Sequence, residues 1–311
     1  MEKNNIHPTQ VGRLEVGTET LLDKAKSLKT VLMSLFKQSG NHDVEGVTSI
    51  NACYGSTNAI FNTLNWIESS SWDGRMGIVI SSDIAVYPKG NARATGGAGA
   101  IAMLIGPNAP IVFDPIRATF IDNSYDFYKP NPSSEYPLVD GHVSMGVYIN
   151  AMLRCYDTLK AKQMNRYKEC MSYKDFDYFA FHTPFSKMVQ KSFLSLLEYD
   201  IATNPSHFNK SLVNQLDTLV QQVSKQEKTA KVQSLLMKEM GKEWVHKCER
   251  SLFLAKRLGN IYTGSLYNGL LSLICDTSID LKGKSIMMFS YGSGCAASMF
   301  VLRVNGDYSK L

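Results

Sequence analysis

The sequence predicts an α/β protein built from layers of helices and sheets, and three observations lead to this class. The chain has 311 residues with 44% hydrophobic content, which is enough for a substantial core or for two cores packed face to face. Some segments carry apolar residues at helical spacing, and others are short β-branched runs. The two kinds of segment alternate along the chain, which is typical of helices packed on sheets.

The first 109 residues are expected to form one half of this architecture. The pattern predicts, in order, a helix over 21–35 that Gly40 closes, a short strand over 46–52, a helix with Ile60, Leu64 and Ile67 on one stripe, and strands over 76–81 and 98–105. The strand over 76–81 is compact and β-branched, so we expect it to be buried on both faces.

Residues 110–311 are expected to repeat the plan less regularly. We predict a strand over 111–113, a loop over 122–137, a strand over 176–181, a helix carrying Val189, Phe193 and Leu197, a buried helix over 261–274 and two strands within 284–304. The charged segment over about 209–257 reads as a largely helical insertion on the surface.

Cys53 is the most informative single residue. It stands between a predicted strand and a predicted helix, in the sequence Asn-Ala-Cys-Tyr-Gly-Ser-Thr. The positive dipole end of the following helix should stabilise a thiolate here and lower the pKa of the thiol. Gly55 should let the backbone turn sharply beside the sulfur. The alternative is a small buried apolar cysteine, which is common.

The composition excludes several classes of protein. The formal charge of +5 comes from 33 basic and 28 acidic residues without a long basic run, so we expect no nucleic acid partner. The six cysteines form no CxxC pair, which argues against a zinc site or a disulfide framework. No apolar run approaches the roughly 20 residues that span a bilayer, and the first residues lack a signal peptide. We therefore predict a soluble, cytoplasmic protein without a metal.

Four sequence blocks, 11–20, 51–57, 65–75 and 125–130, resemble hydroxymethylglutaryl-CoA synthase in order and in spacing. The resemblance runs from about Met1 to beyond Val304. It implies a thiolase-like αβαβα layered fold with two similar halves, 1–109 and 110–311, and a homodimer.

The resemblance also implies three catalytic residues. Cys53 matches the nucleophile that takes the acetyl group from acetyl-CoA, Glu19 the general acid/base and His182 the histidine that orients and polarises acetoacetyl-CoA. These residue types suit the chemistry, because a thiolate forms thioesters readily and a desolvated carboxylate can remove a methyl proton. An imidazole beside the ketone can donate a hydrogen bond as the oxygen gains charge.

Each role has a structural alternative. Glu19 could be only a favourable charge near the start of the next helix. His182 could be a core histidine with its hydrogen bonds satisfied. The sequence 181–191 keeps the His, Pro and two Lys positions of the family motif, and this match favours the catalytic reading of both residues.

Seven further residues are candidates for substrate binding. Lys187 and Lys191 are four residues apart, so they share a helix face that could meet the phosphates of CoA, although most such pairs are solvated. By resemblance Lys191 is the stronger of the two. The others match binding positions of the family and are Asn91, Thr95, Ser144, Asn260 and Ser293; a helix cap, turn residues and surface polar groups are their alternatives.

Two carboxylates and a glycine run lie near these positions. Asp83 and Asp126 match acidic positions around the family's active site, but we interpret them as turn formers outside direct contact with substrate. The run Gly96-Gly97-Ala98-Gly99 precedes a strand, whereas a phosphate-cradling loop opens a helix, so we expect tight packing there instead.

The predicted reaction joins acetyl-CoA, acetoacetyl-CoA and water to give hydroxymethylglutaryl-CoA and CoA, with CoA thioesters as substrates and no cofactor. One alternative is a ketoacyl synthase, which usually pairs its cysteine with His-His or His-Asn; Glu19 speaks against it. The other is a truncated, non-catalytic paralogue or fragment that binds CoA or a full-length subunit.

Family members carry an opening strand-and-helix region before the Glu19 block and a further C-terminal region, and the sequence as given has neither. We therefore expect an incomplete N-terminal half with uncovered apolar surface and an unpaired sheet edge, and a lower stability or a loss of activity. A mitochondrial location is the alternative if a targeting segment lies upstream.

Overall fold

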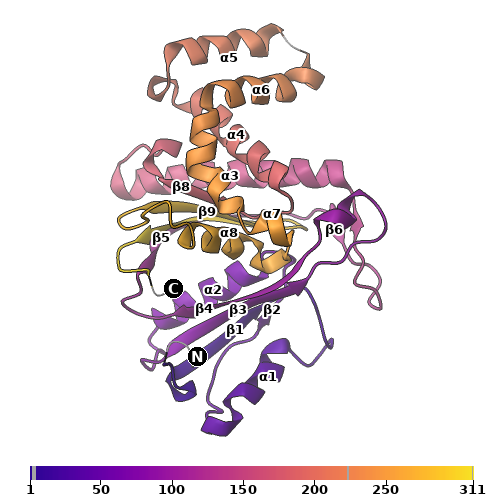
Figure 1. Cartoon of the computed structure of the whole chain (residues 1–311), viewed down its shortest axis with the longest axis vertical. Helices are drawn as coiled ribbons and strands as arrows, with labels where there is room; N and C mark the ends of the chain where they lie inside the picture. The colour runs from indigo at the N-terminus through magenta and orange to yellow at the C-terminus, as the bar shows by residue number, and fades with distance from the viewer. Residues whose placement is uncertain (2–4, 223, 310) are drawn as a thin grey trace.

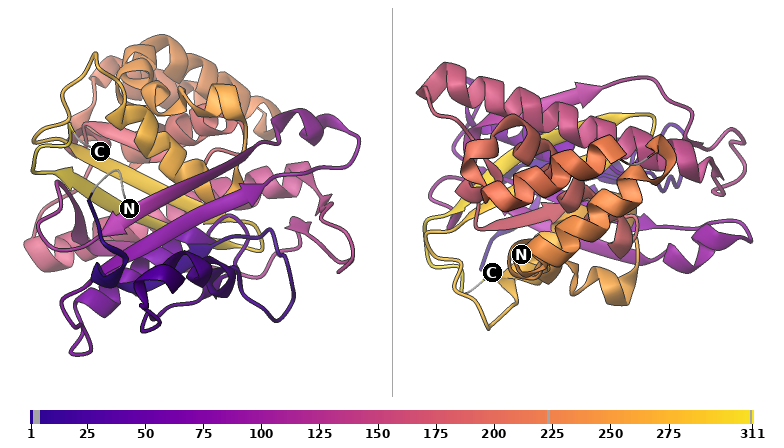
Figure 2. Two further views of the ribbon diagram at one scale, coloured as in Figure 1. Left: turned by 60° about the horizontal axis from the view of Figure 1, so that its bottom comes forward. Right: turned by 90° about the horizontal axis from the view of Figure 1, so that it is seen from above.

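The computed structural model describes residues 1, 5–222, 224–309 and 311, which form a stack of alternating helical and sheet layers (Figure 1, Figure 2). Two four-stranded sheets face each other. Helices α2 (Gly55–Ile67) and α8 (Ser265–Ile274) lie between them, and further helices cover the outer faces. The resulting order of layers is αβαβα, as the resemblance implied.

The first sheet has the strand order β2-β1-β3-β4. Its strands are β1 (Val11–Gly17), β2 (Thr48–Ser49), β3 (Met76–Ile84) and β4 (Ala98–Ile105). The β1 strand pairs in parallel with β2 and β3, and β4 pairs antiparallel with β3. The outer face is covered by α1 (Leu28–Leu32) and the 3₁₀ segment η3 (Met33–Ser39), around a small core that contains Phe36.

The second sheet has the order β5-β10-β9-β8. Its strands are β5 (Ile111–Ile121), β8 (Tyr178–Phe181), β9 (Ser285–Gly292) and β10 (Ala296–Val304), and a separate pair is formed by β6 (Phe127–Tyr128) and β7 (Leu138–Val139). Helices α3 (Gly141–Tyr167) and α4 (Ser186–Thr203) pack on its outer face and share the largest hydrophobic cluster with it.

The two sheets repeat one topology. In the first, β1 is parallel to β3 and β3 is antiparallel to β4; in the second, β8 is parallel to β9 and β9 is antiparallel to β10. A helix of the middle layer, α2 or α8, precedes the central strand in both. In the second sheet β5 pairs with the far edge of β10, whereas no strand in the described part of the chain occupies that place beside β4. Among the described residues, β4 is therefore an edge strand of the first sheet.

The segment over 209–257 projects from the layers (Figure 1) but is more than a surface insertion. It contains α5 (Lys210–Gln222), α6 (Lys225–Glu243), the π-helical turn η7 (Trp244–Cys248), η8 (Glu249–Leu252) and the start of α7 (Ala255–Leu258). Side chains of Val232, Leu236, Trp244 and Cys248 are buried in the main hydrophobic cluster. The helical prediction is confirmed, and the segment lies at the surface as expected, although these side chains join it to the core.

Other elements differ from expectation in extent. The predicted helix over 21–35 begins only at Leu28, because residues 21–27 form bends in which Asp23 accepts the backbone N–H groups of Ala25 and Lys26. The strand predicted over 46–52 shrinks to Thr48–Ser49. The β3 strand alternates buried and half-buried residues, so it is not buried on both faces. The strand over 98–105 is confirmed as β4.

The remaining short 3₁₀ segments are η2 (Pro8–Gln10), η4 (Asn91–Thr95), η5 (Tyr173–Asp175), η6 (Pro205–His207) and η9 (Tyr262–Gly264). Among the described residues, none of the helices combines the length and the apolar character that crossing a membrane requires.

Candidate active site

Cys53 lies in the turn that leads from β2 into α2, two residues before the helix begins. The preceding residue, Ala52, has a φ of +44°, a strained conformation for a residue with a Cβ, and such strain is concentrated at functional sites. Gly55 does not need a positive φ; a Cβ there would lie 2.6 Å from the carbonyl oxygen of Ser49. Its role is therefore close packing of the turn against β2, which differs from the sharp turn expected.

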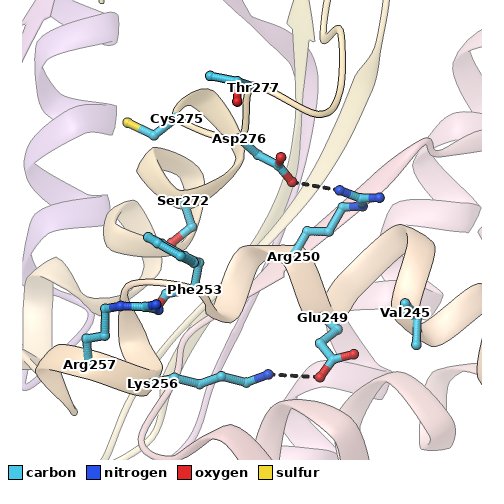
Figure 3. A pocket seen from close by; sticks show the side chains of 10 residues that line it. All are labelled: Val245, Glu249, Arg250, Phe253, Lys256, Arg257, Ser272, Cys275, Asp276 and Thr277. Atoms are coloured by element: carbon cyan, nitrogen blue, oxygen red, sulfur yellow. Dashed lines mark hydrogen bonds and ion pairs between the residues drawn. The ribbon is translucent and has the colours of Figure 1, made fainter.

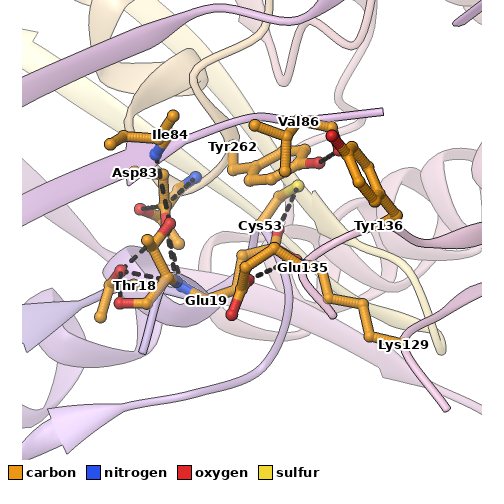
Figure 4. Close-up of polar contacts among 12 residues, drawn as sticks. Thr18, Glu19, Cys53, Asp83, Ile84, Val86, Lys129, Glu135, Tyr136 and Tyr262 are labelled. Carbon is orange, nitrogen blue, oxygen red and sulfur yellow. Dashed lines mark hydrogen bonds and ion pairs between the residues drawn. The ribbon is translucent and has the colours of Figure 1, made fainter. Parts of the chain in front are cut away.

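Glu19 reaches Cys53 from the end of β1. The thiol of Cys53 donates a hydrogen bond to Oε1 of Glu19 at 3.3 Å (Figure 4). The other carboxylate oxygen, Oε2, lies 3.5 Å from Nζ of Lys129. Glu19 is buried, so its two oxygens are divided between one thiol and one ammonium group. Its alternative role, as a charge near a helix start, is wrong, because no helix begins within the residues that follow it directly.

Asp83 holds the backbone around Glu19 (Figure 4). This buried carboxylate accepts hydrogen bonds from the backbone N–H groups of Glu19, Thr20 and Thr263 and from the hydroxyl groups of Thr18, Thr20 and Thr263. It belongs to β3 and not to a loop. Asp83 thus lies outside the cavity and fixes the position of Glu19, as a network of satisfied buried polar groups does.

The ionisation of the pair follows from burial. Burial raises the pKa of Glu19 to about 7, and Lys129 opposes this rise. Burial first, and then the nearby carboxylates of Glu19 and Asp83, raise the pKa of the Cys53 thiol well above its usual value. The lowered thiol pKa expected from the helix dipole is therefore wrong for the free protein. Since the thiol already donates to Glu19, this carboxylate is placed to accept the proton when the sulfur attacks.

His182 follows β8 and faces the same cavity as Cys53. Its backbone N–H donates to the carbonyl oxygen of Phe289 at 2.8 Å, and its own carbonyl oxygen accepts the hydroxyl of Tyr148 at 2.6 Å. Burial lowers the pKa of the imidazole to about 3, so the ring is neutral at physiological pH. A neutral imidazole can donate a hydrogen bond to a carbonyl oxygen without carrying a charge.

One cavity of about 450 Å³ connects these groups to the surface. Cys53 and His182 line it, together with five of the predicted substrate-binding residues: Asn91, Thr95, Ser144, Asn260 and Ser293. Glu19 does not line the cavity and contacts it through Cys53. Lys187 is exposed and Lys191 half-buried, and neither lines the cavity. The Nζ atom of Lys191 lies 3.9 Å from Sδ of Met145, which does line it.

Asn260 is held firmly inside the protein. Its amide oxygen accepts hydrogen bonds from the backbone of Tyr262 and the hydroxyl of Ser265, and its amide nitrogen donates to the hydroxyl of Tyr87. The capping alternative is not confirmed, because the N-cap residues of η9 and α8 are Ile261 and Gly264. The glycine run packs beside it: Gly97 donates its N–H to the carbonyl oxygen of Asn260, and a Cβ at Gly97 would lie 1.9 Å from the carbonyl oxygen of Leu258. Tight packing, as expected, is what this run provides.

Aromatic residues form a wall of the cavity that sequence reasoning did not identify. The rings of Tyr87, Phe127 and Tyr262 meet edge to face, with centroids 6.0 to 6.4 Å apart, and Cys53 packs against this cluster. Asp126, for which the sequence favours a turn, is buried nearby and accepts a hydrogen bond from the hydroxyl of Tyr291. The only available signal was the density of aromatic residues in 125–136, which does not show where the rings point.

A larger cavity of about 660 Å³ lies elsewhere, beside η8 and the end of α8 (Figure 3). Its charged residues are mostly paired with each other, Arg250 with Asp276 and Lys256 with Glu249. None of the predicted site residues lines it. Within the described part of the chain, no cluster of His, Cys, Asp and Glu residues has the arrangement of a metal site.

Comparisons with known proteins found matches over the whole chain. The family described as "Hydroxymethylglutaryl-coenzyme A synthase N terminal" matches residues 1–110, and that described as "Hydroxymethylglutaryl-coenzyme A synthase C terminal" matches residues 111–311. Hydroxymethylglutaryl-CoA synthase of Mycosarcoma maydis is 46% identical over all of this chain and 70% of its own length. The mitochondrial enzyme of Rattus norvegicus is 48% identical over 99% of this chain. This chain spans 62% of that relative's length.

Solved structures show the same fold. The structure "MvaS in complex with 3-hydroxy-3-methylglutaryl coenzyme A" superposes with a TM-score of 0.83 at 27% identity, over 99% of this chain and 70% of that one. The structure "Crystal structure of HMG_CoA synthase complexed with CoA" superposes with a TM-score of 0.71 at 26% identity, over 96% of this chain and 66% of that one.

Proposed function

The chain belongs to the hydroxymethylglutaryl-CoA synthase family, and we propose that it condenses acetyl-CoA with acetoacetyl-CoA and water to give hydroxymethylglutaryl-CoA and CoA. The observation that carries the proposal is the hydrogen bond from Cys53 to Glu19, because it couples a nucleophile to a base at the wall of a cavity that His182 also lines. Two relatives with known structures bind hydroxymethylglutaryl-CoA and CoA, which supports CoA thioesters as ligands.

The first step is acyl transfer. The Sγ atom of Cys53 attacks the thioester carbonyl of acetyl-CoA while its proton passes to Oε1 of Glu19, 3.3 Å away. A new carbon–sulfur bond forms to Cys53, the bond to the sulfur of CoA breaks, and free CoA leaves as a thiol. Because the pKa of Glu19 is raised to about 7, the carboxylate can both accept and return a proton near neutral pH.

The second step makes the carbon–carbon bond. Ionised Glu19 removes a methyl proton from acetyl-Cys53, and the resulting enolate carbon attacks the ketone of acetoacetyl-CoA. The neutral imidazole of His182 donates a hydrogen bond to the ketone oxygen as it gains charge. This oxygen takes up the proton that Glu19 removed from the methyl group and becomes the hydroxyl of the product. Water then cleaves the bond to Cys53, which releases hydroxymethylglutaryl-CoA and restores the thiol.

The polar residues of the cavity wall would orient the acyl chains. We assign this role to the five predicted residues that line the cavity, Asn91, Thr95, Ser144, Asn260 and Ser293. Lys187 and Lys191 lie outside this lining, and we assign them to the phosphates of CoA. The aromatic wall beside Cys53 would keep water from the enolate. No step requires a metal or a redox cofactor.

We extend the proposal to a homodimer in the cytoplasm. Val47 and Ile50 flank the short edge strand β2 and are more than half exposed, which supports an apolar contact between copies. Light scattering of the purified protein and localisation of the tagged protein in cells test these two points.

The activity itself is tested by product analysis. The purified protein is incubated with acetyl-CoA and acetoacetyl-CoA, and the mixture is examined by mass spectrometry for hydroxymethylglutaryl-CoA, with Cys53→Ala as the control. Product that depends on Cys53 supports the proposal. Binding of CoA without product would instead favour the non-catalytic alternative.

A further inference from the structure

Lys129 is the charged residue in the active site that the proposed mechanism leaves without a role. Its Nζ atom lies 3.5 Å from Oε2 of Glu19 and 5.3 Å from the ring centroid of Tyr262. Its side chain is only 18% exposed. A solvated surface lysine would not be held against a buried carboxylate and an aromatic face in this way, because both contacts cost side-chain freedom and hydration.

The segment that carries Lys129 is anchored on the second half of the protein. Asp126 accepts hydrogen bonds from the hydroxyl of Tyr291 and the backbone N–H of Gly294, both at 3.2 Å. Phe127 pairs with Val139 across β6 and β7 and packs its ring against Tyr262. Lys129 lies in the second half and contacts the carboxylate that the first half supplies. Its backbone is held in place by the contacts of Asp126 and Phe127 just before it.

The titratable groups that face Glu19 come from four other elements. They are Cys53 in the turn before α2, Asp83 in β3, Tyr87 in the loop that follows β3 and Tyr262 in η9. Asp83 raises the pKa of Glu19, and the hydrogen bond from the Cys53 thiol lowers it. Among these described neighbours Lys129 is the only cation, so it alone offsets the cost of a charged carboxylate through a full opposite charge.

A second carboxylate competes for the same ammonium group. Oε2 of Glu135 lies 3.2 Å from Nζ of Lys129, but the side chain of Glu135 is half exposed. Solvent screens the exposed pair more strongly than the buried one. The pair of Lys129 with Glu135 thus lies on the solvent side of the ammonium group. The pair with Glu19 determines the electrostatic effect of Lys129 on the site.

We propose that Lys129 is a positioning residue that holds Glu19 as a carboxylate with its other oxygen, Oε1, directed at Cys53. The catalytic part of this inference rests on the proposed function. In that reaction Glu19 must be ionised before it can remove the methyl proton of acetyl-Cys53. The division of the two oxygens of Glu19 is its geometric basis: Oε2 faces Lys129, and Oε1 accepts the hydrogen bond of the thiol.

The pairing also serves the return of the proton. Once Glu19 is protonated it no longer pairs with the ammonium group, and Lys129 then favours release of that proton over its retention. Removing the charge should therefore slow methyl-proton abstraction most at low pH, where the remaining carboxylate fraction is smallest. Binding of acetyl-CoA should change little, because Lys129 does not line the cavity.

The test measures the ionisation of Glu19 without any substrate, so it is independent of whether the condensation occurs. The protein is labelled with ¹³C at the glutamate side-chain carboxyl carbons, and the titration of Glu19 is followed by NMR, with Glu19→Gln identifying its signal. The midpoint is expected near pH 7 in the unmodified chain. In Lys129→Met and Lys129→Gln it should rise by about 1 pH unit or more, as loss of an adjacent opposite charge predicts.

Three comparisons separate this role from a structural one. Lys129→Arg keeps the charge and should keep the midpoint close to that of the unmodified chain. Glu135→Gln should leave it close to that value or slightly lower, because Lys129 loses only its exposed partner. Lys37→Met, at an exposed lysine of η3, is the matched control and should change nothing. Circular dichroism verifies that each variant is folded. If one of Lys129→Met and Lys129→Gln does not fold, the other still provides the test.

A second readout connects the pairing to chemistry. If the proposed function is correct, exchange of the methyl hydrogens of acetyl-Cys53 in deuterated water should be about tenfold slower in Lys129→Met at pH 6 and recover as the pH rises, with an unchanged KM for acetyl-CoA. If the titration midpoint of Glu19 shifts in the neutral variants but no acetyl-Cys53 forms in the unmodified chain, the proposed function is contradicted and the role of Lys129 is supported. An unshifted titration in both neutral variants, or a shift in Lys129→Arg as large as in Lys129→Met, would overturn the role of Lys129.

Discussion

The thiol of Cys53 donates a hydrogen bond to the carboxylate of Glu19 at 3.3 Å, although the two residues are 34 positions apart in the chain. The parallel pairing of β1 with β2 brings them together, because Glu19 follows the end of β1 and Cys53 follows the end of β2. In the proposed mechanism the pair is a nucleophile with its base. Glu19 is buried, and Cys53 is half-buried at the cavity wall. The reactivity of the site therefore depends on the proton that the two groups share.

The pH dependence of proton abstraction follows from the base. The pKa of Glu19 is raised to about 7, and only the carboxylate can remove a methyl proton. Exchange of the methyl hydrogens of acetyl-Cys53 should therefore rise with pH through about 7 and then level off. Glu19→Gln should lower the exchange rate by about 10²–10⁴-fold and remove the pH dependence. A Glu19→Gln variant with unchanged exchange would contradict the assignment of the base.

Folding stability should carry the opposite pH dependence. Between pH 4.5 and about 7 the folded state binds the proton of Glu19 more tightly than the unfolded state does, so stability is lost as the pH rises through this window. Glu19→Gln removes the cost of burying the charge, and it should raise the free energy of unfolding by up to about 3 kcal/mol at pH 8 and very little at pH 4.

Urea denaturation at the two pH values measures this difference. Glu68→Gln, at an exposed carboxylate that follows α2, is the matched control and should shift the midpoint little at either pH. Equal free energies of unfolding for the Glu19→Gln variant and the unmodified chain at pH 8 would contradict this prediction. They would show that burial of the charged carboxylate does not destabilise the fold.

His182 should matter for the second substrate alone. Its imidazole is neutral because burial lowers its pKa to about 3, so it should contribute no inflection to activity between pH 5 and 8. His182→Ala should reduce condensation by about 10²–10³-fold while acetyl-Cys53 still forms, since the imidazole acts on the ketone of acetoacetyl-CoA. Quenched-flow mass spectrometry separates the two steps, with the exposed His42→Ala as control. Equal loss of both steps would contradict this division of roles.

Asp83 should stabilise the fold as well as the site. Asp83→Ala would leave buried hydrogen-bond donors of Glu19, Thr20 and Thr263 without their acceptor, and we expect a loss of about 3 kcal/mol or more in the free energy of unfolding. Chemical denaturation measures the loss, and the exposed Asp217→Ala should be nearly neutral. Full stability of the Asp83→Ala variant would mean that water replaces the carboxylate.

Local sequence patterns could predict the layered architecture but not all of its parts. The strand at β4 and the helix at α2 were evident because their apolar residues follow the period of the element. The α3 helix was missed, although Tyr148, Ala151, Met152, Cys155 and Tyr156 recur at helical steps on its buried face. Its many polar residues and its length obscure that stripe in a local reading.

The sequence could predict which residues form the candidate site, but not their contacts or their pKa values. Cys53, Glu19 and His182 were identifiable through the resemblance, and five of the predicted binding residues line the cavity. The raised pKa of Cys53 was not predictable, because the carboxylates and the burial that cause it come from β1 and β3. The place of Lys129 depends equally on tertiary contacts, since Asp126 anchors its segment on the second half.

The central claim is that Cys53, activated by Glu19, carries the acetyl group. The most direct measurement is to incubate the purified protein with acetyl-CoA, digest it and locate the acetyl adduct by mass spectrometry. We predict an adduct on Cys53 and on none of the five other cysteines, which disappears when acetoacetyl-CoA is added. The absence of an adduct on Cys53 from a folded protein that binds acetyl-CoA, or an adduct that forms equally well in Glu19→Gln, would contradict the account.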